Sequence, residues 1–282
     1  MIRSLGELTT EDDMAQQGPG QAEQAARRAA NSNKLETAAR AGYAVNGVMH
    51  LLIGFIALQV AWSGSGKKAD QSGALGTLAG NGFGKGVLWL GVIGFLGLAI
   101  WQVTEAAFSS RGEGKDKVLE KVKSVSKAVV YAALALTTLQ FARGGGSSSS
   151  GQSQDFTASM LRHSGGRTLV VLIGLVVVGV GIYHVVKGAT KGFLKDLVEH
   201  PGPVIVRLGV AGYVAKGVAL GVVGLLFVVA GLHESPSRAT GLDGALKTLR
   251  DQPFGTVLLT AVALGIMAYG LYSFARAKYA RL

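Results

Sequence analysis

Six apolar segments divide the sequence, and each is close to the roughly 20 residues that a helix needs to cross a bilayer. They run over residues 43–62, 87–108, 125–141, 169–187, 210–232 and 257–274. Apolar residues lie on all sides of these segments, as is typical of helices that are surrounded by lipid and by one another. We therefore predict an all-α integral membrane protein with six transmembrane helices.

The composition of the chain points the same way. Charged residues make up 16% of it, whereas about 25% is usual in a soluble protein. The formal net charge is +11, but the basic residues gather at the ends of the apolar segments and not in runs interleaved with aromatic residues. This distribution predicts contact with membrane lipids, whose anionic headgroups attract such ends, and no binding of nucleic acid. The chain has no cysteine, which excludes disulfides and thiol catalysis.

The flanking lysines and arginines also predict an orientation. The side that holds both termini carries nearly twice as many of them as the opposite side, and cytosolic loops are enriched in these residues. We predict a multi-pass protein of the bacterial plasma membrane with both termini in the cytosol. Residues 1–40 are polar and are expected to form a disordered cytosolic tail.

An internal repeat is the strongest pattern in the sequence. The segment Ala41-Gly-Tyr-Ala-Val-Asn-Gly-Val48 matches Ala211-Gly-Tyr-Val-Ala-Lys-Gly-Val218, and a Gly-Ala-Leu-x-Thr-Leu segment follows in both copies. A middle copy is more divergent. We place the three copies, of two transmembrane helices each, at residues 41–108, 124–188 and 206–276. Each copy enters and leaves on the same side, so the copies are parallel, and we predict a pseudo-threefold arrangement of three helical hairpins.

Short segments on the side away from the termini are predicted to form interfacial helices. Asp243 is well placed as the N-cap of one of them, with Ser72 at the aligned position and Asp155 nearby. Leu75 and Leu78 are three residues apart and should share a helix face. Before the middle segment, the run of glycine and serine at residues 144–151 predicts a flexible linker.

The repeats, with a Gly-Tyr-x-x-x-Gly opening at Gly42 and again at Gly212, resemble a bacterial family of uncharacterised membrane proteins, domain of unknown function 1206. Its members are common in actinobacteria. The resemblance implies the three-repeat architecture and a bacterial plasma membrane. It implies no activity and no site residues.

Polar residues inside the apolar segments are the candidates for a functional site, because they are costly in lipid. They recur at matching places near the terminal ends of the helices. We call this set the polar layer; it comprises Asn46, His50, Gln102, Glu105, Lys127, His184, Lys187 and Lys216.

Two interpretations of the polar layer stand beside each other. Either the lysines reach out to the interface and Glu105 pairs with one of them, or the layer forms a cytosol-facing cavity for an anionic headgroup or metabolite. A third interpretation places haem or a metal between His50 and His184. No cluster of acids or cysteines supports a metal site, so we predict no metal and no cofactor.

Three functions follow from these readings. We favour a non-catalytic scaffold or accessory component with a membrane protein partner, because the sequence contains no nucleotide fingerprint and no catalytic motif. We therefore predict no catalytic residues. The alternative is a carrier or channel for a small molecule or lipid that uses the polar layer, and the third is a haem-binding redox protein.

Overall fold

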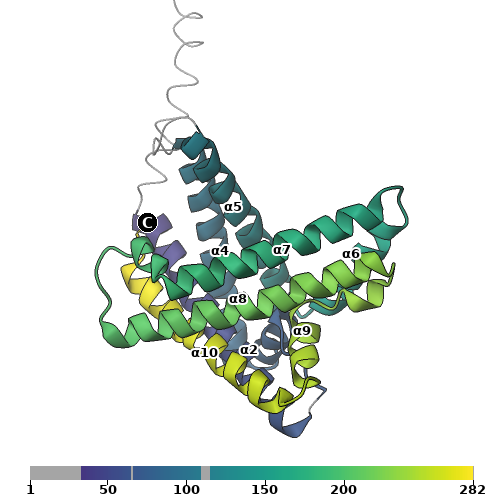
Figure 1. The fold of residues 1–282 in the computed structure, drawn as a ribbon. Coiled ribbons are helices and arrows are strands. Elements are labelled where there is room, and N and C mark those ends of the chain that lie inside the picture. Colours follow the sequence, from purple (N-terminus) through teal and green to yellow (C-terminus); the bar gives the residue numbers. More distant parts are fainter. Residues whose placement is uncertain (1–32, 65, 109–114, 282) are drawn as a thin grey trace, which may run out of the picture.

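The chain forms a bundle of long helices joined by short helical turns (Figure 1). A computed structural model describes residues 33–64, 66–108 and 115–281. Each long helix meets the length and hydropathy of a membrane span, so the prediction of an all-helical chain with six such helices is confirmed. They are α2 (Asn33–Ser63), α4 (Gly82–Phe108), α5 (Lys115–Ala142), α7 (Gly166–Ala189), α8 (Pro203–Leu232) and α10 (Gly255–Tyr279).

The helices extend beyond the apolar segments. Helix α2 begins at Asn33, so residues 33–40 are helical and the expectation that they belong to a disordered tail is wrong; residues 1–32 lie outside the described part. Helix α8 begins at Pro203, seven residues before its apolar segment. Proline is favoured in the first helical turn because its missing N–H would have no partner there.

Shorter elements lie at the two ends of the bundle. We call the end where α2 begins and α10 ends the terminal face, and the opposite end the loop face. One short helix joins the two long helices of each repeat on the loop face: α3 (Gln71–Ala79), α6 (Ser149–Leu161) and α9 (Gly241–Arg250). Two 3-10 turns follow α7 and α8, namely η1 (Gly192–Asp196) on the terminal face and η2 (Pro236–Arg238) on the loop face.

The caps of these short helices differ from the expected ones. Asp70 caps α3 and accepts a hydrogen bond from the N–H of Gly73 (3.0 Å), while α6 is capped by Ser148. Asp243 is not the N-cap of α9, because Thr240 precedes that helix. Its carboxylate instead accepts a hydrogen bond from the backbone N–H of Ala69 (2.9 Å). Asp243 thus joins the loop-face segments of the first and third repeats.

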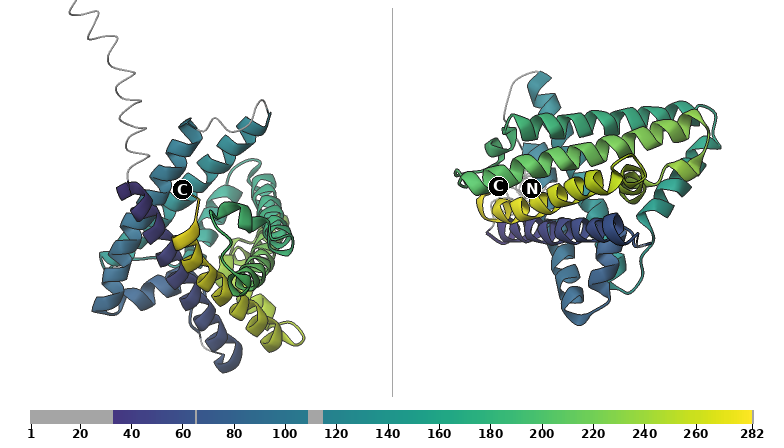
Figure 2. Two further views of the ribbon diagram at one scale, coloured as in Figure 1. Left: turned by 90° about the vertical axis from the view of Figure 1, so that its left-hand side faces the viewer. Right: turned by 60° about the horizontal axis from the view of Figure 1, so that its bottom comes forward.

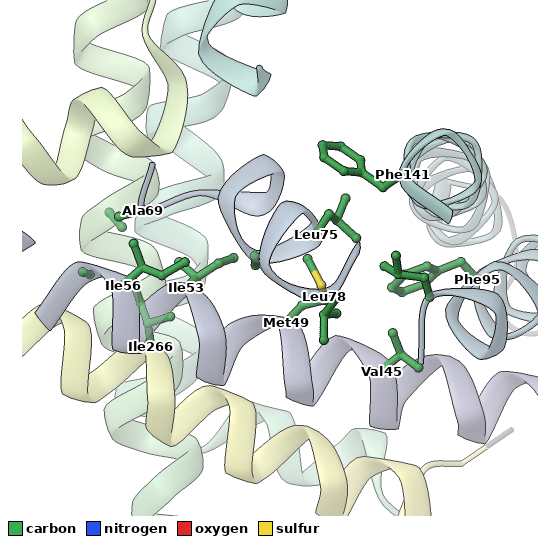
Figure 3. Close-up of a cluster of buried hydrophobic side chains, with 14 of the residues drawn as sticks. Val45, Met49, Ile53, Ile56, Ala69, Leu75, Leu78, Phe95, Phe141 and Ile266 are labelled. Atoms are coloured by element: carbon green, nitrogen blue, oxygen red, sulfur yellow. The ribbon is translucent and has the colours of Figure 1, made fainter. Parts of the chain in front are cut away.

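The main hydrophobic core surrounds α3 (Figure 3). Leu75 and Leu78 both point inward from α3 and are almost fully buried, which agrees with the shared face predicted for them. They pack against α2 at Met49, against α4 at Phe95 and against α5 at Phe141 (Figure 3). A leucine pair in a loop-face helix therefore closes the space between helices of the first two repeats.

The three repeats follow one another in a cycle. The second long helix of each repeat packs along the first long helix of the next, which pairs α4 with α5, α7 with α8 and α10 with α2. The last of these pairs brings the two ends of the described chain together, and the views of Figure 2 show α2 and α10 side by side. This order follows the pseudo-threefold plan that the parallel repeats predict.

Equivalent glycines make close backbone contacts in two interfaces of the cycle. A Cβ atom on Gly47 of α2 would lie 2.9 Å from the carbonyl oxygen of Gly270 on α10. At the same place in the next interface, a Cβ on Gly217 of α8 would lie 2.6 Å from the carbonyl oxygen of Gly181 on α7. Only glycine permits backbones to approach this closely. The second glycine of the Gly-Tyr-x-x-x-Gly opening is thus a packing residue.

The second repeat departs from the plan. The two long helices pack on each other in the first repeat (α2 with α4) and in the third (α8 with α10), whereas in the described part of the chain α5 and α7 do not pack along one another. Figure 2 shows the pair α4 and α5 crossing the layer of the other helices at a steep angle. The cycle is therefore closed at every interface except the one inside the second repeat.

The short helix of the second repeat packs differently from that of the first. In the first repeat, α3 packs against both long helices of its own repeat, whereas α6 packs against α7 and makes no comparable contact with α5. Thr157 is the fully buried residue of α6, where α3 buries two leucines. The first part of the glycine–serine run connects α5 to α6, with φ +84° at Gly144 and +141° at Gly146. Residues 149–151 are the first turn of α6, so the prediction that they belong to a flexible linker is wrong.

Two glycines on α7 provide a matched test of the helix contacts. A Cβ at Gly181 would meet the backbone of α8, whereas a Cβ at Gly179 would meet nothing within 4 Å. We expect G181A to lower the free energy of unfolding by about 1–3 kcal/mol because the helices must move apart. G179A should be neutral or slightly stabilising, since alanine is the better helix former. Thermal unfolding in mild detergent measures both, and equal effects would contradict the close contact.

Candidate functional site

The polar layer lies near the terminal face, where helices from all three repeats converge. Several interactions there involve a residue outside the polar layer, Arg276 on α10. Its guanidinium carbon lies 4.4 Å from the centre of the Tyr43 ring on α2, and Nη2 donates a hydrogen bond to the Tyr43 hydroxyl (3.2 Å). A cation over the face of an aromatic ring is attracted by the electrons of the ring.

The same contact recurs in the next interface of the cycle. Lys187 on α7 occupies the place of Arg276, and Tyr213 on α8 occupies the place of Tyr43. Lys187 Nζ lies 5.6 Å from the centre of the Tyr213 ring. The tyrosine of the Gly-Tyr-x-x-x-Gly opening therefore receives the cation of the preceding repeat in both interfaces where the motif is present.

Aromatic rings fill the space between these two contacts. Tyr213 lies 5.3 Å from Tyr269 and 5.7 Å from Tyr272, between ring centres. Phe193 of η1 stacks on Tyr213 at 5.2 Å, and Lys216 Nζ lies 4.3 Å from the Tyr269 ring centre. We call the following residues the tyrosine cluster: Tyr43, Tyr131, Tyr213, Tyr269 and Tyr272. Arg276 lies within electrostatic range of Tyr43, Tyr131, Tyr213 and Tyr269, which come from four different helices.

Cations outnumber carboxylates around the cluster. Lys187 forms an ion pair with Asp196 of η1, with 2.7 Å between Nζ and Oδ2. Lys127 on α5 lies within electrostatic range of Glu105, Asp196, Arg276 and Lys187. Among the described residues, Arg276 and Lys216 form no ion pair. Lys187 thus pairs with an acid other than Glu105, the one that the sequence analysis expected to pair with a cation.

Several buried polar atoms at this level have no partner in the described part of the chain. They are Nε of Arg276, the hydroxyl of Tyr272 and Oε1 of Gln102. Most buried polar groups in proteins form hydrogen bonds, so such atoms are uncommon. Tyr272 and Gln102 are themselves almost completely buried. The polar layer thus has more hydrogen-bonding capacity than the described residues use.

The two histidines are not brought together. His50 packs against Tyr269 (4.8 Å) and His184 against Tyr213 (5.9 Å), so two tyrosine rings separate them. In each histidine Nδ1 lies 2.8 Å from the carbonyl oxygen four residues earlier in its own helix. No group of three metal-ligating side chains occurs in the regions that the structure describes. A haem or metal bridging the two rings does not fit this arrangement.

The remaining residues of the polar layer are Asn46 on α2 and two residues of α4. Asn46 donates a weak hydrogen bond to the Ser273 hydroxyl on α10 (3.4 Å). Gln102 and Glu105 lie on α4, and the carboxylate of Glu105 lies within electrostatic range of the ammonium group of Lys127. The first repeat thus contributes an acid, where the second and third contribute the cations Lys187 and Arg276.

Backbone hydrogen bonds close the cluster on the terminal face. The N–H of Val198 donates to the carbonyl of Tyr279 (2.8 Å), and the N–H of Arg281 donates to the carbonyl of Asp196 (2.9 Å). Arg40 adds hydrogen bonds to the last carbonyls of α10. Phe193 is fully buried beneath this pairing. The segment that follows α7 and the end of the chain therefore form a floor under the rings.

Sequence reasoning missed two parts of this site. Asp196 was overlooked because η1 lies in a loop whose fold the hydropathy pattern does not predict. The tyrosines were treated as markers of the repeat. Their signal was present, because Tyr43 and Tyr213 are each the third residue of the matching segments 41–48 and 211–218. Each stands three residues before a member of the polar layer, Asn46 or Lys216, and so shares a helix face with it.

The contact between Tyr43 and Arg276 can be separated into its parts. We expect Y43L to lower the free energy of unfolding by about 1–2 kcal/mol, because it removes both the ring face and the hydroxyl that Arg276 contacts. Y43F keeps the ring and should cost less than half of that. Thermal unfolding of both variants measures the difference, and equal losses would assign the contact to the hydroxyl alone.

Comparison with known proteins places the chain in a family. The model of the Domain of Unknown Function (DUF1206) matches residues 41–109, 122–191 and 211–280. The "Uncharacterized protein YxxB" of Bacillus subtilis (strain 168) is 29% identical over 247 residues, which cover 85% of this chain and 89% of that protein. No solved structure matches. The three matched segments coincide with the three helix pairs described above, and the chain belongs to the DUF1206 family.

Proposed function

We propose that this chain is a membrane-embedded binding protein for an anionic ligand, held at the polar layer on the terminal face. The observation that carries the proposal is the pair of cations without a carboxylate partner, Arg276 and Lys216, in the middle of the tyrosine cluster. Tyrosine hydroxyl groups and guanidinium N–H groups are both donors that suit an oxyanion.

Electrostatics supports an anion as the occupant. A charged side chain at the centre of a bilayer costs about 3 kcal/mol or more unless it is paired or solvated. Lys216 stands thirteen residues after the start of α8, which is about 20 Å along the helix axis. At that depth its ammonium group lies over the ring of Tyr269. An anion between Lys216 and Arg276 would offset the cost of both charges.

A role as scaffold or accessory subunit is the second proposal, and the helices of the second repeat favour it. Within their most apolar windows only 17% of α7 and 22% of α5 is buried, against 44–50% for the other four spans. The glycine stripes are used for contacts inside the chain, as Gly181 illustrates. A membrane protein partner would therefore meet the branched aliphatic faces of α5 and α7.

Charge neutralisation provides the test of the proposed function. The full chain in mild detergent is mixed with inorganic phosphate and, separately, with phosphatidylglycerol, and binding is followed by native mass spectrometry and thermal unfolding. We expect R276Q and K216Q each to weaken binding of the ligand about tenfold or more, since a charge-assisted hydrogen bond contributes about 1.5–3 kcal/mol. R276K should retain most of the binding.

The matched control is K278Q, which removes an exposed charge from the same helix, two residues from Arg276. It should bind as the unaltered chain does. The proposed function is wrong if neither phosphate nor phosphatidylglycerol binds, or if both bind equally well to the unaltered chain, R276Q and K216Q.

The proposed orientation places the terminal face in the cytosol of a bacterial cell. The chain has no cysteine, so a single introduced thiol reports on one position alone. We expect S147C in the connection before α6 to react in intact cells with a membrane-impermeant maleimide, whereas K278C at the end of α10 should react only after the cells are opened. The reverse pattern would place the terminal face outside.

A further inference from the structure

The source of the anion follows from how the site can be approached, and this inference rests on the proposed function. On the terminal face, η1 and the end of the chain close the floor by backbone hydrogen bonds, with Phe193 fully buried. Helices α8, α10 and α2 pack in sequence around the tyrosine cluster. Among the described elements, the interface of the cycle at which the long helices do not pack along one another is the one between α5 and α7, and we take it as the approach.

Cations stand on both sides of this approach. Lys127 on α5 is exposed, whereas the side chain of Lys187 on α7 is only 18% exposed. The two lie within electrostatic range of each other and of Arg276. Asp196 forms an ion pair with Lys187, and Glu105 lies within electrostatic range of Lys127 at the edge. Arg276, further in, is the cation that forms no ion pair among the described residues. An anion that entered between α5 and α7 would meet Lys127 first and Arg276 after it.

The surfaces next to these cations are apolar. Val129 and Val130 on α5 are more than half exposed, as are Ile182 and Val186 on α7. Inside a bilayer such surfaces contact acyl chains. A free phosphate ion would have to cross this apolar zone, whereas the headgroup of a lipid reaches the level of the helix ends while its chains remain beside the helices.

We propose that the ligand is the phosphate headgroup of an anionic lipid of the leaflet on the terminal side. It enters laterally between α5 and α7 and binds to Arg276 and Lys216, with Lys127 and the hydroxyl of Tyr131 as further contacts on the side of α5. Tyr131 lies on α5 one turn from Lys127 and within electrostatic range of Arg276. The acyl chains lie along the exposed aliphatic residues of α5 and α7. Negative charge and two chains define the ligand class.

Lipid binding is tested on the full chain in mild detergent by native mass spectrometry and by the shift in thermal midpoint. Phosphatidylglycerol should bind at least about tenfold more tightly than phosphatidylcholine, since only the former carries a net charge. K127Q should weaken the binding of phosphatidylglycerol about tenfold, given the value of one charge-assisted contact. K121Q, an exposed lysine of the same helix outside the cluster, is the matched control and should leave binding unchanged.

The lateral route is tested with a phosphatidylglycerol that carries a diazirine in its acyl chain, in vesicles of phosphatidylcholine with one-tenth of the probe. After illumination, we expect adducts on peptides of α5 and α7, and their loss in K127Q and in R276Q but not in K121Q. The same adducts in all variants would show lipid that coats the protein without a site and would overturn the proposal.

The two proposals fail in different ways. If inorganic phosphate binds in a manner that depends on Arg276 and phosphatidylglycerol does not compete with it, the anion site stands and the lipid is the wrong source. If phosphatidylglycerol binds through Arg276 but its chains label α2, α4 or α10 instead, the lateral route is wrong. If no anion distinguishes R276Q from the unaltered chain, the proposed function fails as well.

Discussion

The close contact between glycines of successive repeats is the constraint on which the arrangement depends. Where Gly47 meets Gly270, and where Gly217 meets Gly181, the backbones of two helices touch. Each contact lies one to two turns from a tyrosine on one helix and a cation on the other. Side chains at that distance along two touching helices must meet. The glycine contacts fix the register of the two helices. Because the tyrosine and the cation stand on these same helices, that register also brings their side chains together.

Hydropathy and spacing were sufficient to predict the helices and the repeat. The six spans are long and uniformly apolar, and the matching segments at residues 41–48 and 211–218 align the first and third copies without further information. The level of the polar layer also followed from spacing, because equivalent positions in parallel copies lie at equivalent depths. The loop-face helices were predicted correctly in place but not in their caps. Asp243 has the residue type of a cap, yet its carboxylate bonds to Ala69 in another repeat, a contact between segments distant in the sequence.

The partners within the polar layer were beyond what the sequence pattern can predict. Whether a lysine pairs with an acid, leans on a ring or reaches the interface depends on which helices are neighbours, and the periodicity of a uniformly apolar helix does not identify its neighbours. Lys187 forms an ion pair with Asp196, which lies in a turn that has no hydropathy signal, whereas Lys216 lies over the ring of Tyr269. The separation of α5 and α7 was likewise unpredicted. The divergence of the middle copy and its glycine–serine connection were visible, but divergence alone does not say which contact is lost.

The incomplete cycle gives the molecule one direction of mechanical freedom. Every other pair of neighbouring long helices is held by side-chain packing or by backbone contact at glycine, and the floor under the rings ties the start of α2 to the end of α10. The helices therefore fall into two packed groups of three, α2 with α4 and α5, and α10 with α8 and α7, which meet along α2 and α10. The distance between α5 and α7 is the one that no packing between long helices fixes, so a change in the lateral pressure of a surrounding membrane would act on that distance first.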